Sequence, residues 1–309
     1  MNVESLQNVE SNEVLLSILI PAYNYSAGIE RIFNQLDLFA VSSLWHRIEI
    51  IVIDDSSDSN VATLMKTAID TIKCVRYTHN NPAAGPCKNW NMLLEQAKGK
   101  YCILMHHDEF PITKNFISKS LQHIEENNDV DMIMMDCILM NKSTNSLRRH
   151  IPSFIRIKVF ESCPEYLFRR NVIGPTASLI IKRSLLSTFD CKLTWLIDVD
   201  SYYQLRKKIK HWVFSGDLKI ASYIDRNNSI TEKLGNEIPE IRQREYEYLS
   251  LKHVDALVWL TNKKSYMFLE NLLWVGFRVI TRSFWYVMNK LKRYPVSNEM
   301  ARKAFENHK

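Results

Sequence analysis

The chain has 309 residues, of which 46% are hydrophobic and 24% are charged, so it is long enough and apolar enough to bury a large core. Its six scattered cysteines form no CxxC pair, which argues against a disulfide scaffold or a zinc ribbon and favours a reducing compartment. None of its seven glycines belongs to a GxGxxG or GxxxxGKS/T motif, so the sequence excludes a glycine-rich phosphate-binding loop. Residues 1–16 contain neither a basic start nor a long apolar run, and they therefore predict no signal peptide.

The net charge of +6 is distributed unevenly along the chain. Residues 263–309 contain ten Lys and Arg against three Asp and Glu, a net charge of +7, so the residues before them sum to −1. A basic segment of this kind indicates an anionic partner, either lipid or nucleic acid. The alternative is a helix face whose charges are simply solvated.

The first third of the sequence alternates short apolar runs with amphipathic segments. The apolar runs are rich in β-branched residues and end in polar residues, as buried strands do. The predicted order is strand 14–24, helix 27–40, strand 48–55, helix 59–73, strand 74–80, helix 89–99 and strand 100–109. This alternation is typical of a parallel sheet with helices on both faces.

The pattern is less regular beyond this point. Residues 142–160 are basic and irregular, and residues 237–309 are mostly helical in pattern. Before the basic segment, the sequence predicts a strand over 129–141. After it, the sequence predicts a helix over 161–172, a strand turning into a helix over 174–186, a helix over 195–209 and a hairpin-like pair of strands over 212–224.

Three of the predicted strands end in polar residues. They are Tyr23-Asn24, Asp54-Asp55 and the four-residue stretch 106–109, which reads His-His-Asp-Glu. Because ligands of open α/β sheets bind beyond the carboxyl ends of the strands, we expect an oxygen-rich ligand site at this edge.

Five segments in this order resemble the family 2 glycosyltransferases, over roughly residues 14–231: SILIPAYN, IEIIVIDDSSDS, NPAAGPCKNWNMLLEQAKGKYCILMHHDE, GPTASLIIKRSLL and WLIDVDSYYQL. The resemblance implies the GT-A fold, an α/β, Rossmann-like and mostly parallel sheet with helices on both faces. It implies a catalytic domain over 1–236, with a nucleotide-sugar half at about 14–141 and an acceptor half at about 142–236. Residues 237–309 would then form a basic, aromatic-rich helical extension.

The resemblance places the nucleotide base beside the ends of the first two strands. Pro21, Tyr23 and Asn24 would pack beside the base, or would simply form a turn, since Pro and Asn are common in turns. Asp54 would accept a hydrogen bond from the base. Asp55 would contribute to the same site, or would cap the next helix.

Two basic residues are assigned to the diphosphate by the same resemblance. Lys88 lies at a predicted helix start, where a cation can reach a phosphate, although an ordinary surface lysine would look the same. Arg226 stands where relatives often carry a histidine near the phosphates or the metal. Residues 174–176 would line the acceptor side.

The stretch 106–109 corresponds to the DxD motif of the family. Asp108 matches the position that binds Mn²⁺ or Mg²⁺. Glu109 would be a further metal ligand, or would hold Asp108 in place without contacting the metal. His106 stands where the first aspartate usually stands, and an imidazole would favour Mn²⁺ over Mg²⁺. With His107, it would lie beside the nucleotide-sugar.

Asp198 in the WLIDVD segment matches the family's general base. One carboxylate there would deprotonate the acceptor hydroxyl as it attacks the anomeric carbon, so a single displacement inverts the configuration. Ile197 replaces the glutamate that usually precedes the base. The alternative for these aspartates is stabilisation of a helix N-terminus, which suits Asp200 better than Asp198.

Residues 265–293 are crowded with aromatic side chains, yet no uncharged run in them exceeds seven residues. A bilayer span needs about 20 apolar residues, so the sequence predicts no transmembrane helix here. With the charges of 263–309, the segment suits an interfacial helix on an anionic membrane. The alternative is a helical cap that packs on the catalytic domain or on a second subunit of a homo-oligomer.

The sequence therefore leads to an inverting glycosyltransferase that moves a sugar from a nucleotide-sugar, expected to be a UDP-sugar, to a hydroxyl of a glycan or lipid-linked glycan. Mn²⁺ or Mg²⁺ is the expected cofactor, and no nucleic acid partner is expected. The family suggests bacterial capsule or O-antigen assembly at the cytoplasmic face of the plasma membrane. A degenerate, non-catalytic binding protein stays open because of His106 and Ile197. A nucleotidyltransferase fits less well, because such enzymes carry a glycine-rich, lysine-bearing loop near the first strand.

Overall fold

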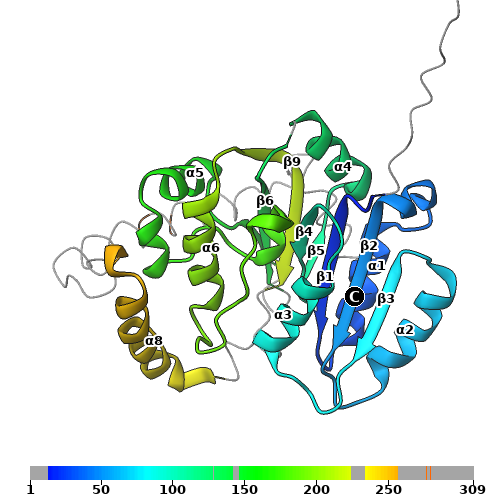
Figure 1. Cartoon of the computed structure of the whole chain (residues 1–309), viewed down its shortest axis with the longest axis horizontal. Helices are drawn as coiled ribbons and strands as arrows, with labels where there is room; N and C mark the ends of the chain where they lie inside the picture. Colours follow the sequence, from blue (N-terminus) through cyan, green and yellow to red (C-terminus); the bar gives the residue numbers. More distant parts are fainter. Residues whose placement is uncertain are drawn as a thin grey trace, which may run out of the picture.

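A nine-stranded sheet covered by helices forms the centre of the computed structural model (Figure 1). The structure describes residues 13–127, 129–141, 146–223 and 234–256, together with Gly276 and Val279. Along the sheet the hydrogen-bonded order is β3-β2-β1-β4-β8-β6-β9-β5, and β7 pairs with β6. The sheet joins both halves of the expected catalytic region into one layer.

The first half of the chain forms the parallel part of this sheet. Strand β1 pairs in parallel with β2 and with β4, and β2 pairs in parallel with β3. The elements are β1 (Leu16–Ala22), α1 (Ser26–Leu36), β2 (Ile48–Asp54), α2 (Asn60–Thr71), β3 (Val75–His79), α3 (Pro86–Gln96) and β4 (Tyr101–Leu104). The alternation predicted from the apolar runs is confirmed, with boundaries that differ by a few residues.

The second half is mixed rather than parallel. Strand β8 runs antiparallel to both β4 and β6, and β5 runs antiparallel to β9, whereas β6 and β9 are parallel. The strands are β5 (Glu109–Pro111), β6 (Met132–Asn141), β7 (Ser146–Arg149), β8 (Leu179–Lys182) and β9 (Trp212–Tyr223). Strand β5 follows β4 closely in the chain but lies at the end of the hydrogen-bonded path, with β8, β6 and β9 between the two.

The hairpin predicted over 212–224 is wrong, because this segment is the single strand β9. Gly216 and Asp217 suggested a turn. Instead, the pairing register with β6 shifts between Met135 and Asp136, so that Ser215 and Lys219 face consecutive residues of β6. The turn-forming residues therefore make a bulge within one strand.

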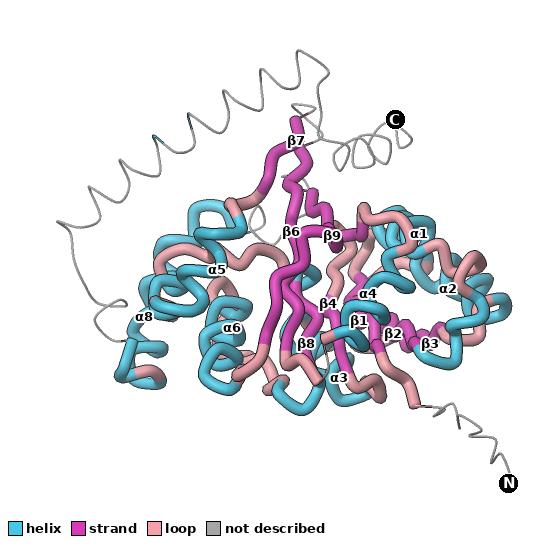
Figure 2. The backbone as a smooth tube through the Cα atoms, turned by 90° about the horizontal axis from the view of Figure 1, so that it is seen from above, coloured by secondary structure: helices cyan, strands magenta, loops and turns pink. Residues whose placement is uncertain are grey.

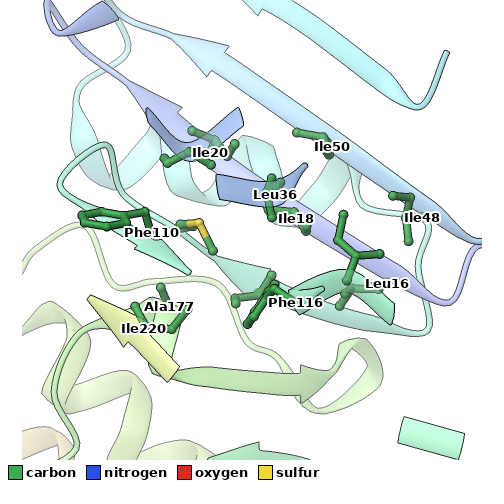
Figure 3. Close-up of a cluster of buried hydrophobic side chains, with 14 of the residues drawn as sticks. Leu16, Ile18, Ile20, Leu36, Ile48, Ile50, Phe110, Phe116, Ala177 and Ile220 are labelled. Carbon is green, nitrogen blue, oxygen red and sulfur yellow. The ribbon is translucent and has the colours of Figure 1, made fainter. Parts of the chain in front are cut away.

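Helices cover both faces of the sheet, as the strand alternation requires. On one face, side chains of β1 and β2 pack with α1, α2 and α4 (Phe116–Glu126), and Figure 3 shows part of this cluster. On the other face, alternate residues such as Leu19 and Ile51 pack with α3, α5 (Ser153–Ser162) and α6 (Ile197–Lys208). The expected two-sided α/β architecture is confirmed.

The segment 142–160, which looked irregular in the sequence, contains strand β7 and most of helix α5 where the structure describes it. Residues 161–172 hold the end of α5 and a short 3₁₀ helix, Pro164–Phe168, rather than one continuous helix. Two further 3₁₀ turns, Thr176–Ser178 and Arg183–Leu185, flank β8, so the helix expected after that strand is a single turn.

Helix α8 (Ile238–Lys252) is the described part of the expected helical extension. It lies beside α6 at the end of the molecule farthest from β3 (Figures 1 and 2). Buried Glu245 accepts hydrogen bonds from the backbone N–H groups of Thr194, Trp195 and Leu196, which precede α6. Helix α8 thus packs on the loop that leads into α6.

The cysteines depart from the sequence expectation at one pair. Cys87, in the first turn of α3, forms a disulfide with Cys191, 104 positions further along the chain. No spacing motif could have shown this pair, because the fold alone brings the two residues together. The four other cysteines are free, so no disulfide scaffold exists, but the bridge weakens the argument for a reducing compartment.

The basic segment 263–309 lies outside the described residues, apart from Gly276 and Val279. The interfacial helix expected there therefore stays a prediction. Within the described part of the chain, no helix is both long and apolar enough to cross a bilayer.

Candidate active site

A cavity of about 680 Å³ opens between the two halves of the sheet. Its lining includes the turn 106–109, which follows β4. Asp198 at the start of α6, residues 167–171 and residues 174–176 also line it. The structure therefore brings the expected metal-binding aspartate and the expected base, 90 positions apart, onto the same cavity.

Helix α1 positions the 106–109 turn through a close backbone approach. A Cβ atom on Gly28 would lie 2.3 Å from the carbonyl oxygen of His107, so only glycine fits there. One turn along the helix, the Nη2 of Arg31 donates to the same oxygen at 3.1 Å. The guanidinium carbon of Arg31 lies 4.4 Å from the ring centroid of Tyr223, a cation–π contact that fixes the arginine.

The Glu109 carboxylate is engaged by its surroundings and is only 4% exposed. Its Oε2 accepts hydrogen bonds from the backbone N–H groups of His106 at 3.0 Å and Ala177 at 3.3 Å. Its Oε1 lies 3.4 Å from Nδ1 of His106, and the Thr176 hydroxyl lies 3.1 Å from the same nitrogen. Glu109 thus orients the His106 ring.

Burial lowers the pKa of His106, but the carboxylates of Glu109, Asp108 and Asp198 outweigh this effect and hold the pKa above its usual value. The ring is therefore biased toward its cationic form. Its Nε2 is buried without a hydrogen-bond partner among the described residues. Such an orphaned donor suits an anionic ligand.

Burial and the adjacent Glu109 carboxylate raise the pKa of Asp108 to about 6. A divalent cation fits beside this group, because it would supply the countercharge that the buried carboxylate lacks. No cluster of three His, Cys, Asp or Glu side chains in the described parts of the chain is arranged to hold an ion. Phosphate oxygens and water would therefore have to complete the coordination.

Asp198 lies in the first turn of α6, and its carboxylate is held in a fixed orientation. Its Oδ2 accepts a hydrogen bond from the side-chain amide of Asn171 at 2.6 Å, and its Oδ1 accepts one from the N–H of Val199 at 2.8 Å. Burial raises the pKa of Asp198 to about 6, although these hydrogen bonds and His106 oppose the shift. A carboxyl group with this pKa is suited to proton transfer near neutral pH.

Asp200 points away from the cavity and is 1% exposed. Its Oδ1 lies 2.6 Å from Nε2 of His253, and its Oδ2 accepts a hydrogen bond from Lys252 at 2.9 Å. Asp200 therefore ties α6 to the end of α8. This contact between helices differs from the helix N-terminal role that the sequence suggests for Asp200.

The residues expected at the nucleotide base lie outside the cavity, at the carboxyl ends of β1 and β2. Asp54 is fully buried, where its carboxylate accepts hydrogen bonds from the N–H of Ser56 and the hydroxyl of Tyr77, both at 2.8 Å. Asp55 accepts from the N–H groups of Ala84 and Gly85, in the loop that leads into α3. Both carboxylates thus shape the loops of this edge.

Four further residues expected at the donor lie at or near the same edge. Pro21 is buried within β1, whereas Tyr23 is exposed. Asn24 has φ 47° and accepts a hydrogen bond from the N–H of Ser57. Lys88 is exposed on the first turn of α3. Arg226 lies outside the described residues.

Three residues of this site have no signal in the sequence that would single them out. Asn171, which holds Asp198, lies in a stretch whose pattern is helical, and nothing in its spacing marks it. Arg242 reaches the cavity from α8, and Glu245 of the same helix fixes the loop before α6. Only the folding of α8 onto α6 makes either of them part of the site.

The sequence model described as "Glycosyl transferase family 2" matches residues 17–202. An uncharacterized glycosyltransferase of Haemophilus influenzae is 31% identical over 38% of this chain and 44% of its own length. The Escherichia coli protein named UDP-Glc:alpha-D-GlcNAc-diphosphoundecaprenol beta-1,3-glucosyltransferase WfaP is 31% identical over 36% of this chain and 41% of its own length. The chain thus matches less than half of the length of these two relatives.

Solved structures share the fold. TarS 1–349 of S. aureus, in complex with UDP-GlcNAc, superposes with a TM-score of 0.58 at 16% identity, over 82% of this chain and 69% of that one. The mannosyltransferase PcManGT of Pyrobaculum calidifontis, in complex with GDP-Man and Mn²⁺, superposes with a TM-score of 0.52 at 12% identity, over 95% and 85%. The expected GT-A fold is confirmed, and because the family model covers more than half of the sequence, this chain belongs to glycosyl transferase family 2.

Proposed function

We propose that the protein is an inverting glycosyltransferase that transfers a sugar from a nucleotide-sugar to an acceptor hydroxyl. The observation that carries this proposal is the shared cavity, whose lining includes both Asp108 and the oriented carboxylate of Asp198. Single displacement requires the leaving group and the base on opposite sides of the reacting carbon. A cavity lined by acidic groups from two separate elements can provide this arrangement.

Asp198 is the proposed general base. Its Oδ2, held by Asn171, would accept the proton of the acceptor hydroxyl as the oxygen attacks the anomeric carbon. The bond from that carbon to the nucleoside diphosphate breaks in the same step, so no covalent intermediate forms. Since the Asp198 pKa is raised to about 6, the carboxylate is ionised at neutral pH and still basic enough to take the proton.

Asp108, His106 and His107 are the proposed diphosphate site. Asp108 would hold Mn²⁺ or Mg²⁺, which stabilises the charge on the departing diphosphate. The ring of His106, whose pKa the neighbouring carboxylates raise, would donate from Nε2 to a phosphate oxygen, a role that replaces the missing first aspartate of the motif. Glu109, whose carboxylate is engaged by His106 and Ala177, would support this ring rather than contact the metal.

The base site is proposed at the edge beyond β1 and β2. The exposed Tyr23 and the turn of Pro21 and Asn24 would flank the base, while Asp54 and Asp55 would keep the surrounding loops in place. Lys88, on the first turn of α3, would reach the diphosphate, and Arg226 is proposed for the same role. A UDP-sugar is the proposed donor for two reasons. The name of the related protein WfaP includes UDP-Glc, and the structurally similar TarS was solved in complex with UDP-GlcNAc.

A glycan or a lipid-linked glycan is the proposed acceptor, as the name of WfaP suggests for a related chain. We further propose that residues 263–309, with their net charge of +7, bind an anionic membrane at its cytoplasmic face or contact a second subunit. Association with vesicles of anionic but not neutral lipid, lost after removal of these residues, would support the membrane contact.

Thermal unfolding with a panel of nucleotides, with and without Mn²⁺, tests the proposed donor site. A ligand that binds the folded state raises the melting temperature by mass action. We expect stabilisation by UDP that requires Mn²⁺ and disappears in Asp108→Ala. Stabilisation by GDP, CDP or TDP instead would change the donor and keep the mechanism. No stabilisation by any nucleotide, in protein that unfolds cooperatively, would overturn the proposal in favour of a non-catalytic binding protein.

A further inference from the structure

Carboxylates and guanidinium groups both line the cavity. Among the described residues, the carboxylates are Asp108 and Glu109, which follow β4, and Asp198 at the start of α6, and Arg31 lies beside the first two. A further part of the lining, built by residues 167–170 and by α8, carries Arg169, Arg170 and Arg242. This part, the basic wall, brings three guanidinium groups to the cavity.

Arg242 is held in a defined orientation by neutral groups. Its Nε donates to the hydroxyl of Tyr246 at 2.6 Å, and its Nη2 donates to the carbonyl oxygen of Arg169 at 2.9 Å. The Tyr246 hydroxyl donates in turn to the carbonyl of Phe168 at 2.6 Å. No carboxylate of the described residues lies within ion-pair distance of Arg242, so these contacts fix the guanidinium without neutralising it.

The fixed guanidinium group of Arg242 is suited to bind an anion. A planar guanidinium whose position is already fixed loses little further entropy when it binds, and its remaining N–H groups match two oxygens of a phosphate. Arg169 supplies both the carbonyl that holds Arg242 and a second basic side chain on the same wall. Arg170 adds a third.

The basic wall is next in the sequence to the residue that holds the proposed base. Arg169 and Arg170 directly precede Asn171, whose amide donates to Asp198. A molecule bound at the arginines would therefore lie on the acceptor side, next to the carboxylate that activates its hydroxyl. The proposed donor diphosphate lies elsewhere in the cavity, at His106 and Asp108.

We propose that Arg242, with Arg169 and Arg170, binds a phosphate group of the acceptor, so that the acceptor is a phosphorylated glycan rather than a neutral one. This inference rests on the proposed transferase function and adds the chemical class of the acceptor. Two sources of the phosphate share this chemistry. One is a diphosphate that links a sugar to a lipid, and the other is a phosphodiester within a polymer.

Binding of soluble probes measured by calorimetry tests the proposal. The probes are an octyl diphosphate glycoside, a glycerol phosphate glycoside and a neutral octyl glycoside, all with the same terminal sugar. Each is titrated into protein with excess UDP and Mn²⁺, after UDP binding has been measured by itself. Arg242→Gln is compared with Arg244→Gln, which removes the same charge from an exposed position of α8 outside the cavity.

We expect at least one phosphorylated probe to bind more tightly than the neutral one. Arg242→Gln should lower the affinity for that probe about 10-fold to 100-fold, as expected for the loss of charge-assisted hydrogen bonds. Arg244→Gln should change this affinity less than about 2-fold. The phosphorylated probe that binds more tightly identifies the source of the phosphate. UDP binding should be the same in both variants.

Three results would overturn the inference: equal binding of neutral and phosphorylated probes, equal effects of the two substitutions, or weakened UDP binding in Arg242→Gln. The last result would assign the arginine to the donor. If Arg242→Gln does not unfold cooperatively, Arg170→Gln provides the same comparison. Failure of UDP to bind at all would count against the proposed function, and the probe titrations would still decide whether the basic wall binds phosphate.

Discussion

The side-chain amide of Asn171 donates a 2.6 Å hydrogen bond to Oδ2 of Asp198. The same asparagine also spans the turn that follows it, since its Nδ2 donates to the carbonyl of Gly174 and its Oδ1 accepts from the Gly174 N–H. One residue thus connects the acceptor-side turn to the proposed base. The geometry of the base depends on this turn as much as on helix α6.

The pH dependence of catalysis should report this contact. Asp198 must be ionised to accept a proton, and its pKa is raised to about 6, so we expect kcat to rise with pH through about 6 and then to level off. The Asn171 hydrogen bond stabilises the ionised form. Asn171→Ala should therefore move the midpoint of the acid limb to higher pH and lower kcat by about 10-fold.

Asn127→Ala is the control for that measurement, because Asn127 donates to the backbone of His123, away from the cavity. Its pH profile should match that of the unchanged protein. An acid limb that stays in place in Asn171→Ala would show that Asp198 is not the group whose ionisation limits the rate.

Two aspartates of α6 should respond to the same substitution in opposite directions. Asp198→Asn removes a charge whose burial is unfavourable, so we expect the free energy of unfolding at pH 7 to rise by about 1–2 kcal/mol while activity falls at least about 100-fold. Asp200→Asn breaks the buried pairing with Lys252 and His253, and it should lower the free energy of unfolding by about 3 kcal/mol.

The stabilisation by Asp198→Asn should itself depend on pH. Because the pKa of Asp198 is higher in the folded state than in the unfolded state, the folded protein binds more protons, and its stability decreases as pH rises from about 4 to about 6. Asp198→Asn has no ionisable group at this position, so its stability should not decrease in this way between about pH 4 and about pH 6. Urea unfolding at pH 4 and pH 7 should show the advantage of the variant only at pH 7, and an equal advantage at both pH values would contradict this explanation.

Helix α8 should be required for an ordered active site. Glu245 accepts N–H groups of Thr194, Trp195 and Leu196, and a glutamine in its place would direct an amide donor toward some of those donors. We expect Glu245→Gln to lower the free energy of unfolding by about 1–3 kcal/mol and to lower kcat. Hydrogen exchange of the three amides measures the local effect.

Glu247→Gln is a matched control on the same helix. Glu247 is exposed, and among the described residues its carboxylate accepts a hydrogen bond only from Gln243, so its substitution should leave stability and exchange unchanged. If both glutamates gave the same small effect, α8 would have to be regarded as a surface helix without influence on the loop before α6.

The Cys87–Cys191 bridge should be detectable by counting thiols. Denatured protein should react with an alkylating reagent at four cysteines without prior reduction and at six after it, because Cys74, Cys102, Cys137 and Cys163 are free. Since the bridge joins α3 to the loop before α6, its reduction should lower the free energy of unfolding by about 2–4 kcal/mol. Cys191→Ser should remove this dependence on reductant, whereas Cys163→Ser should keep it. Six reactive thiols before reduction would show that the two cysteines are not paired.

The sequence determined the elements of the first half and the polar ends of their strands. Short runs rich in β-branched residues favour buried strands, and their alternation with amphipathic helices is typical of a parallel sheet. The polar residues that follow the strands then have to meet at one edge. For this reason the amino-acid sequence alone points to the 106–109 turn, and the place of Asp198 in a family pattern singles out that residue.

The tertiary structure decided which of these residues share a cavity. Asp108 and Asp198 meet there, whereas Asp54 and Asp55 turn their carboxylates to loop N–H groups and Asp200 turns to α8. Asn171, Arg242 and Glu245 have no local signature, because their roles depend on partners far away in the sequence. Local patterns fix which backbone a segment adopts, but the direction of a polar side chain follows from the donors and acceptors that packing brings within hydrogen-bond distance.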